Sequence, residues 1–204
     1  MRTGIFGGTF SPPHLGHVHA AREFLRGLSL DRLYIIPAGI PPHKIVPKSD
    51  DPQLRLEMAR LAFASIGDER IRVSDIELRR TGKSYTYDTL MSFENEGELF
   101  LLCGTDMLMC FESWYRYRDI LSMCTLVVCL RDATSQEEMK AINEKINGLE
   151  STANARIILL PCEAFPVSST QVRDMIRHGE DAGKYLCGDV YGFIKEKGLY
   201  RDEP

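Results

Sequence analysis

The sequence lacks three features that would have indicated other classes of protein. It has no excess of positive charge, because its formal net charge is −4, whereas proteins that bind a nucleic-acid backbone usually carry a basic surface. It has no CxxC pair among its six cysteines, and zinc ligands normally come in close pairs. It also has no apolar run of about 18 residues, which a transmembrane helix would require.

These absences predict the compartment and the state of the cysteines. Most cysteines stand among apolar neighbours, such as Cys129 behind Val127 and Val128, so we expect buried free thiols. No apolar signal segment follows the first residues. We therefore expect a cytoplasmic protein with reduced cysteines, no protein-bound metal, no nucleic-acid partner and no membrane partner. A homo-oligomer is compatible with the sequence, which does not indicate the oligomeric state.

Strand-like and helix-like segments alternate along the chain. Short apolar runs predict strands at 3–7, 33–36, 71–73, 99–103, 125–130 and 157–160. Helical spacing predicts helices at 15–27, 52–66, 84–96, 135–149, 169–178 and 187–197. This alternation predicts an α/β fold, a Rossmann-like, doubly wound, mostly parallel sheet with helices on both faces and a small C-terminal helical segment. At 204 residues the chain fits a single domain, 1–204.

Two of these helices have a clear apolar face. The residues expected to point inward are Leu15, Val18, Ala21, Phe24 and Leu25 in the first helix, and Leu54, Met58, Leu61 and Ala62 in the second. Residues 39–50 contain prolines, a glycine and lysines, and we expect a loop there. Parallel sheets bind ligands outside the carboxyl ends of their strands, which singles out residues 7–17 and 165–173.

Residues 4–17 leave a strand and enter a helix. Gly7 and Gly8 allow a ligand to approach the backbone, and the helix start offers N–H groups and a positive dipole end, which favour a phosphate. His14 and His17 are three apart, so both can lie over that phosphate. The spacing fits neither the dinucleotide fingerprint nor a P-loop. Taken singly, each element is equally typical of an ordinary turn or cap.

Residues 167–173 form a second candidate phosphate site at a helix start, near the other end of the chain. Ser168 or Ser169 is a natural N-cap, because Pro166 disfavours an earlier helix start. Arg173 is expected on the first turn, where its guanidinium can bind two phosphate oxygens. Alone, the segment is also compatible with an ordinary capped helix. Together with residues 7–17 it predicts the opposite side of a polyphosphate site.

The two segments resemble the nucleotidyltransferase superfamily that carries an HxGH signature, and more closely the bacterial nicotinate-nucleotide adenylyltransferases. Supporting segments follow in the family's order, so that the match spans nearly the whole chain: Pro41-Pro42-His43-Lys44, Ser84-Tyr85-Thr86, Gly104-Thr105-Asp106, Trp114-Tyr115 and Gly198-Leu199-Tyr200-Arg201. One position departs, because Ser11 stands where the family usually has aspartate. Serine still donates and accepts hydrogen bonds, so we expect the loop shape to persist, whereas a charge-dependent role there is put in question.

The resemblance implies that the protein joins nicotinate mononucleotide to the AMP part of ATP, giving deamido-NAD and pyrophosphate in NAD biosynthesis. The nucleophile is then an ionised phosphate oxygen, so neither a nucleophilic side chain nor a general base is required. Mg²⁺ is expected to accompany ATP, held mainly by phosphates and water. Two alternatives stay open, namely another phosphorylated acceptor, such as nicotinamide mononucleotide or pantetheine phosphate, and a nucleotide-binding module without catalysis.

The resemblance also implies a role for individual residues. The catalytic residues would be His14, His17 and Arg173. The ATP-binding residues would be Gly7, Gly8, Thr9, Phe10, Gly16, Gly104, Asp106, Ser168, Ser169 and Thr170, with the helices from about 169 to 204 completing the ATP site. The mononucleotide-binding residues would be His43, Lys44, Thr86, Trp114 and Tyr115, with Trp114 stacked on the pyridine ring. The residues themselves leave simpler interpretations open, in which Lys44 is a surface lysine, Asp106 belongs to a turn and Trp114 belongs to the core.

Overall fold

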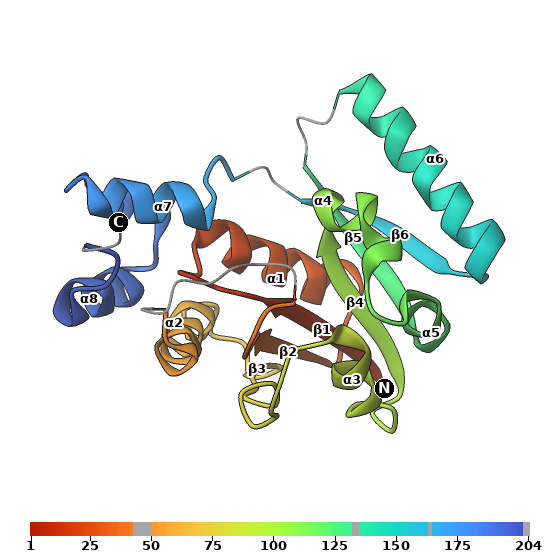
Figure 1. Cartoon of the computed structure of the whole chain (residues 1–204), viewed down its shortest axis with the longest axis horizontal. Coiled ribbons are helices and arrows are strands. Elements are labelled where there is room, and N and C mark those ends of the chain that lie inside the picture. Colours follow the sequence, from red (N-terminus) through yellow and green to blue (C-terminus); the bar gives the residue numbers. More distant parts are fainter. Residues whose placement is uncertain (43–49, 132–134, 163–164, 202–204) are drawn as a thin grey trace.

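The computed structural model describes residues 1–42, 50–131, 135–162 and 165–201, and it contains a six-stranded sheet (Figure 1). The strands are β1 (Arg2–Gly8), β2 (Arg32–Pro37), β3 (Ile71–Val73), β4 (Glu98–Gly104), β5 (Cys124–Arg131) and β6 (Arg156–Cys162). They lie in the order β3-β2-β1-β4-β5-β6, and all neighbouring pairs are parallel. This order confirms the predicted Rossmann-like fold and places the switch point between β1 and β4.

Helices and short 3-10 turns connect these strands and follow the last one. They are α1 (Leu15–Gly27), α2 (Pro52–Ala64), α3 (Thr86–Met91), α4 (Thr105–Met109), η1 (Phe111–Ser113), α5 (Tyr117–Met123), α6 (Gln136–Ala153), α7 (Ser169–Arg177), η2 (Gly183–Tyr185) and α8 (Gly188–Lys197). The helix predicted at 84–96 is wrong at both ends, because only α3 forms. Ser84 instead accepts hydrogen bonds from the backbone N–H groups of Gly39 and Ile40, which keeps it in the preceding loop. No helix was predicted within 105–123, where α4, η1 and α5 form.

Helices cover both faces of the sheet, and the side chains of β4 contribute to the core on each face. Phe100 and Leu102 enter a core with residues of α1, α2, α7 and α8. Leu99, Leu101 and Cys103 enter a second core with residues of α3, α4, α5 and α6. Successive strand side chains point to opposite faces, so an entirely apolar strand fits only between two layers of helices. The continuous apolar run at 99–103 therefore reflects burial on both faces.

The inward face of α2 differs from the prediction. Met58 and Ala62 are buried as expected, whereas Leu54 and Leu61 are only half-buried. The largest fully buried side chain of the described residues is Arg55, also on α2. A pattern of apolar residues cannot indicate that a charged residue is buried. The groups that hydrogen-bond a buried charge and make its burial tolerable lie on other segments of the chain.

The cysteines only partly follow the expectation of buried free thiols. Cys103 and Cys124 are buried, and their burial raises the pKa of both thiols, that of Cys124 to about 12. Cys110 is exposed, and Cys129 and Cys162 form a disulfide, so the expectation is wrong for these three. The parallel pairing of β5 and β6 brings the Cα atoms of Cys129 and Cys162 to 5.7 Å, within the usual range for a disulfide. Among the described residues, no helix is long and apolar enough to cross a membrane.

Candidate functional site

The loop after β1 has one packed glycine and one open glycine. A Cβ on Gly8 would meet the Phe10 ring at 2.9 Å, whereas a Cβ on Gly7 would meet no atom of the described residues within 4 Å. The Phe10 ring is buried and packs edge-on against the rings of Phe6, His17 and Phe63, although its backbone has a φ of +51°. Gly8 therefore makes room for Phe10, and the space beside Gly7 is available to a ligand that approaches the backbone.

The two histidines meet at the beginning of α1, as their spacing predicted. Their ring centroids are 3.8 Å apart, and the Nδ1 atom of His17 accepts a hydrogen bond of 3.1 Å from the backbone N–H of His14. A ring nitrogen that accepts carries no proton, so a neutral His17 holds its proton on Nε2 and donates from there. Gly16 lets the pair form, because a Cβ at Gly16 would lie 3.0 Å from the His14 ring.

The beginning of α7 lies directly against this loop. Ser168 is the N-cap of α7 and accepts a hydrogen bond from the backbone N–H of Gln171. The hydroxyl of Ser169 donates to the carbonyl oxygen of Pro12 at 2.9 Å, and Nη1 of Arg173 donates to the carbonyl oxygen of Ser11 at 2.7 Å. The two predicted phosphate segments, about 150 residues apart in sequence, are thus in contact. Arg173 is the fifth residue of α7, so its expected place on the first turn is wrong by about one residue.

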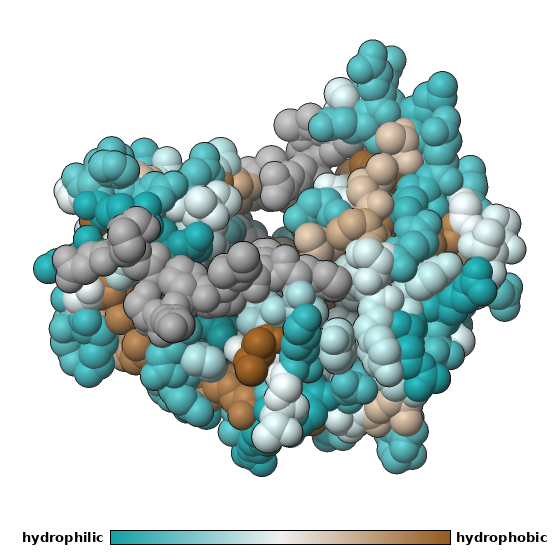
Figure 2. Space-filling model, in the orientation of Figure 1, coloured by the Kyte–Doolittle hydropathy of each residue, from teal (hydrophilic) through white to brown (hydrophobic). Residues whose placement is uncertain are grey.

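The end of β4 contributes the other side of the site. Gly104 is the N-cap of α4, and a Cβ there would lie 2.5 Å from Oδ1 of Asp106, which is exposed. Because β1 and β4 are parallel neighbours, their carboxyl ends lie at the same edge of the sheet. Figure 2 shows a hollow in this face of the molecule between the part that contains α7 and the part that contains α4.

Aromatic side chains gather at the segment predicted to bind the pyridine ring. Trp114 stacks on the buried ring of Phe111, with centroids 4.8 Å apart and planes inclined by 27°. One face of Trp114 therefore packs against the core. Tyr115 is 51% exposed, and its ring lies 4.7 Å from that of Tyr85. Thr86 is the first residue of α3 and is half-buried.

Four further residues concern the site, and they were either not predicted or fall outside the described residues. His43 and Lys44 lie outside the described residues. Two further residues, Asp50 and Arg55, were not predicted, and their buried side chains lie beneath the loop after β1. An aspartate in front of a helix is a common N-cap and an arginine is common within one, so neither residue stands out in the sequence.

Comparison with known proteins assigns the family. Residues 5–175 match the cytidylyltransferase-like family model. Proteins named probable nicotinate-nucleotide adenylyltransferase are 38% identical in Clostridium botulinum strain Eklund 17B, with 99% of each chain covered, and 35% identical in Clostridium kluyveri, with 98% of this chain and 100% of the relative covered.

Solved structures have the same fold. The nicotinic acid mononucleotide adenylyltransferase of Plasmodium falciparum, in complex with NaAD, superposes with a TM-score of 0.74 at 16% identity, over 98% of this chain and 97% of that chain. A structure from Vibrio parahaemolyticus described as a putative nicotinate-nucleotide adenylyltransferase superposes with a TM-score of 0.67 at 18% identity, over 99% and 96%. At these identities the structures support the fold, and the curated relatives carry the assignment. The chain belongs to the nicotinate-nucleotide adenylyltransferase family, within the cytidylyltransferase-like proteins.

Proposed function

We propose that this protein transfers the AMP part of ATP to nicotinate mononucleotide, giving deamido-NAD and pyrophosphate. The observation that carries this proposal is the contact between the histidine pair of α1 and the beginning of α7. Three side chains that can donate hydrogen bonds to phosphate, His14, His17 and Arg173, thereby gather around one loop. Such a cluster beside two helix N-termini suits a triphosphate.

The reaction needs little covalent help from the protein. An oxygen of the nucleotide's phosphate attacks the α-phosphorus of ATP and forms a new P–O bond. The bond from that phosphorus to the oxygen bridging to the β-phosphate breaks, and its electron pair leaves with pyrophosphate. The protein has to align the two anions and offset the charge that develops, which it does by positioning donors.

Each part of the loop and of α7 has a role in this alignment. His17 donates from Nε2 to the α-phosphate in the transition state, with His14 beside it. The beginning of α7 at Ser169 and Thr170, whose backbone N–H groups make no hydrogen bond within the helix, and the side chain of Arg173 hold the β- and γ-phosphates. The remaining ATP contacts come from the backbone or side chains of Gly7, Gly8, Thr9, Phe10, Gly16, Gly104, Asp106 and Ser168.

The aromatic segment after β4 is the site for the acceptor. The ligand's pyridine ring stacks on the face of Trp114 that Phe111 does not cover. Thr86 and the backbone N–H at Tyr115 bind the ring carboxylate, with His43 and Lys44 contributing to the acceptor phosphate. N–H donors favour an acid over an amide, because an amide NH₂ would leave them without an acceptor.

Mg²⁺ enters with ATP and is held mainly by phosphates and water. The side chains that converge at the loop, His14, His17 and Arg173, can each donate a hydrogen bond, so they fit the phosphates rather than a metal ion. Among the described residues, no group of three His, Cys, Asp or Glu side chains could hold a metal. Mg²⁺ generally keeps several waters, so the substrate phosphates would supply its other ligands, and the bound ion would offset part of the charge of the phosphates.

The chain acts as one domain, residues 1–204, in which the helices from about 169 onward complete the ATP site. Two observations support this unit: α7 bonds to the loop after β1, and the side chain of Tyr200 packs with Met58 of α2 in the same core. A cytoplasmic location suits the substrates, ATP and nicotinate mononucleotide.

Acceptor choice is the direct test of this function. Pyrophosphate release is expected only when ATP and an acceptor mononucleotide are both present. With nicotinate mononucleotide, kcat/KM should exceed the value for nicotinamide mononucleotide by about a hundredfold or more, since unpaired buried donors discriminate strongly. A coupled pyrophosphate assay measures both values, and pantetheine phosphate serves as a third acceptor. Preference for the amide would contradict the carboxylate site, and ATP binding without pyrophosphate release would favour a non-catalytic module.

The two glycines after β1 give a matched pair of variants. Gly7→Ala places a methyl group in open space, so thermal stability should be unchanged, while the Kd for ATP should rise about tenfold because the methyl group occupies the ligand's place. Gly8→Ala should instead lower the free energy of unfolding by about 1–3 kcal/mol, because its methyl group meets the buried Phe10 ring. Calorimetric titration and urea unfolding measure the two effects. Unchanged ATP affinity in Gly7→Ala would remove that residue from the site.

A further inference from the structure

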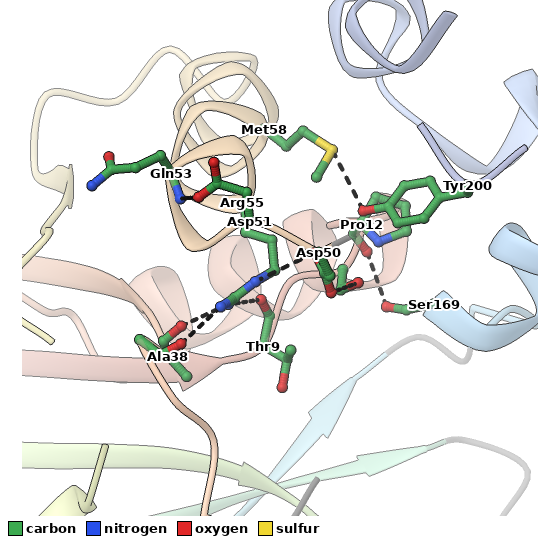
Figure 3. Close-up of polar contacts among 12 residues, drawn as sticks. Thr9, Pro12, Ala38, Asp50, Asp51, Gln53, Arg55, Met58, Ser169 and Tyr200 are labelled. Atoms are coloured by element: carbon green, nitrogen blue, oxygen red, sulfur yellow. Dashed lines mark hydrogen bonds and ion pairs between the residues drawn. The ribbon is translucent and has the colours of Figure 1, made fainter. Parts of the chain in front are cut away.

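A buried ion pair lies beneath the loop that follows β1 (Figure 3). Oδ1 of Asp50 lies 3.5 Å from Nε of Arg55, and the two side chains are 3% and 1% exposed. Burial lowers the pKa of Arg55 and the carboxylate of Asp50 raises it, and an arginine remains charged under such conditions. Because taking two charges out of water is costly, a buried pair is tolerated only when further hydrogen bonds satisfy it.

The two terminal nitrogens of Arg55 donate hydrogen bonds to the backbone of two loops. Nη1 donates to the carbonyl oxygens of Thr9 at 2.8 Å and Ala38 at 2.6 Å, and Nη2 donates to that of Gly39 at 3.0 Å. Thr9 follows β1 and Ala38 follows β2, so one side chain fastens both loops at the edge of the sheet where the site lies. The charge that makes these bonds strong is balanced by Asp50.

The other carboxylate oxygen extends the network to α7. Oδ2 of Asp50 accepts a hydrogen bond from the hydroxyl of Ser11, and the carbonyl oxygen of Ser11 accepts the bond from Arg173. Tyr200 borders the same place, where burial and the negative charge of Asp50 raise the pKa of its hydroxyl. A continuous path of polar contacts therefore runs from Arg55 through Asp50 and Ser11 to Arg173.

We propose that Asp50 is a positioning residue for the ATP phosphates, a role that rests on the proposed adenylyl transfer. It holds Ser11, whose carbonyl oxygen orients Arg173, and it keeps Arg55 compensated while Arg55 fixes the loop at Thr9. The carboxylate that the chain lacks at position 11 is thus supplied from position 50. Asp50 is buried and does not touch substrate in this role.

Exchanging the serine at position 11 and the aspartate at position 50, whose side chains are hydrogen-bonded, tests this role. The variants are Asp50→Ser, Ser11→Asp and the double exchange Ser11→Asp with Asp50→Ser. The first removes the carboxylate that forms the ion pair with Arg55, and the second places two carboxylates side by side. Each should raise the KM and the Kd for ATP about tenfold or more, because a displaced loop misplaces the phosphate donors. The double exchange restores one carboxylate and one hydroxyl, and should return both constants to within about threefold of the wild type, as for a coupled pair.

A matched carboxylate next in the sequence is the control. Asp51 caps α2 by accepting from the backbone N–H of Gln53 at 2.8 Å, and it is exposed (Figure 3). Asp51→Ser keeps a good N-cap residue, so the ATP constants should change by less than about twofold. The KM for nicotinate mononucleotide should stay within about threefold in all variants, because the acceptor site lies across the hollow. Loss of folded protein would lower kcat without changing either KM.

The outcomes separate this inference from the proposed function. Failure of the wild type to release pyrophosphate would overturn the adenylyl transfer, and the Kd for ATP would still decide the role of Asp50. Wild-type ATP constants in Asp50→Ser would overturn that role, as would a folded double exchange that stays as impaired as the worse single variant. If these variants do not fold, Asp50→Asn decides the role. Its amide oxygen still accepts from Ser11 without compensating Arg55, so a raised Kd for ATP supports the role and an unchanged Kd overturns it.

Discussion

Replacing His17 with alanine should lower kcat by about a hundredfold or more, with a much smaller change in the KM of either substrate. The lost donor acts on charge that develops only in the transition state, and one such donor contributes about 3–4 kcal/mol in comparable sites. Steady-state kinetics with saturating ATP and nicotinate mononucleotide give both constants. His19→Ala is the matched control, since its ring lies on the same helix against Phe165.

His17 has two roles that a second variant can separate. Its Nδ1 accepts from the backbone N–H of His14, and in the proposed reaction its Nε2 donates to phosphate. His17→Asn retains a polar group near the place of Nδ1, which can still accept from the backbone N–H of His14. The shorter asparagine side chain has no donor at the position that Nε2 occupies in His17. This variant should therefore keep wild-type thermal stability and still lose kcat to the same extent as the alanine variant. Activity within a few-fold of the wild type in either variant would show that His17 has no part in the chemistry.

Replacing Arg55 with methionine should lower the free energy of unfolding by about 3–5 kcal/mol. Methionine fits a long buried site, so the loss comes mainly from polar groups rather than from volume. The carboxylate of Asp50 would stay buried without its counter-charge, and the carbonyl oxygens of Thr9, Ala38 and Gly39 would lose their donor. Urea unfolding at neutral pH measures the change.

An exposed arginine on the same helix provides the comparison. Arg60 pairs with Glu57 on the surface of α2, where both side chains are about half exposed. Arg60→Met should cost no more than about 1 kcal/mol, because surface ion pairs contribute little. A loss below about 1 kcal/mol for Arg55→Met as well would show that the buried pair adds almost nothing to stability.

The sequence predicted the elements whose apolar pattern is local. Helix α1 was predicted with its observed bounds, because Val18, Ala21 and Phe24 repeat at helical spacing and Gly27 ends the pattern. The strands were predicted within about two residues for the same reason. The contact between the two phosphate segments was also expected, since strand ends of a parallel sheet share one edge.

Features that depend on contacts between distant segments escaped prediction. Ser84 leaves the predicted helix because its hydroxyl is used by Gly39 and Ile40, about 45 residues away. The burial of Arg55 depends on carbonyl groups that only the folded loops present. One face of Trp114 is covered because η1 turns Phe111 beneath it, and the pairing of Cys129 with Cys162 depends on β5 lying beside β6. None of these relations leaves a periodic trace in the sequence.

The central place of β1 in the sheet has a consequence for synthesis on the ribosome. β1 is made first, yet its neighbour β4 begins only at residue 98, so the middle of the sheet waits for about half the chain to emerge. Contacts this remote in sequence form slowly. The hydrogen bond from Arg173 to the carbonyl oxygen of Ser11 can form only later still, because Arg173 is synthesised after every strand. A nascent chain released before α7 can therefore hold every strand of the sheet and still lack Ser169, Thr170 and Arg173, so truncated translation products would be inert rather than partially active.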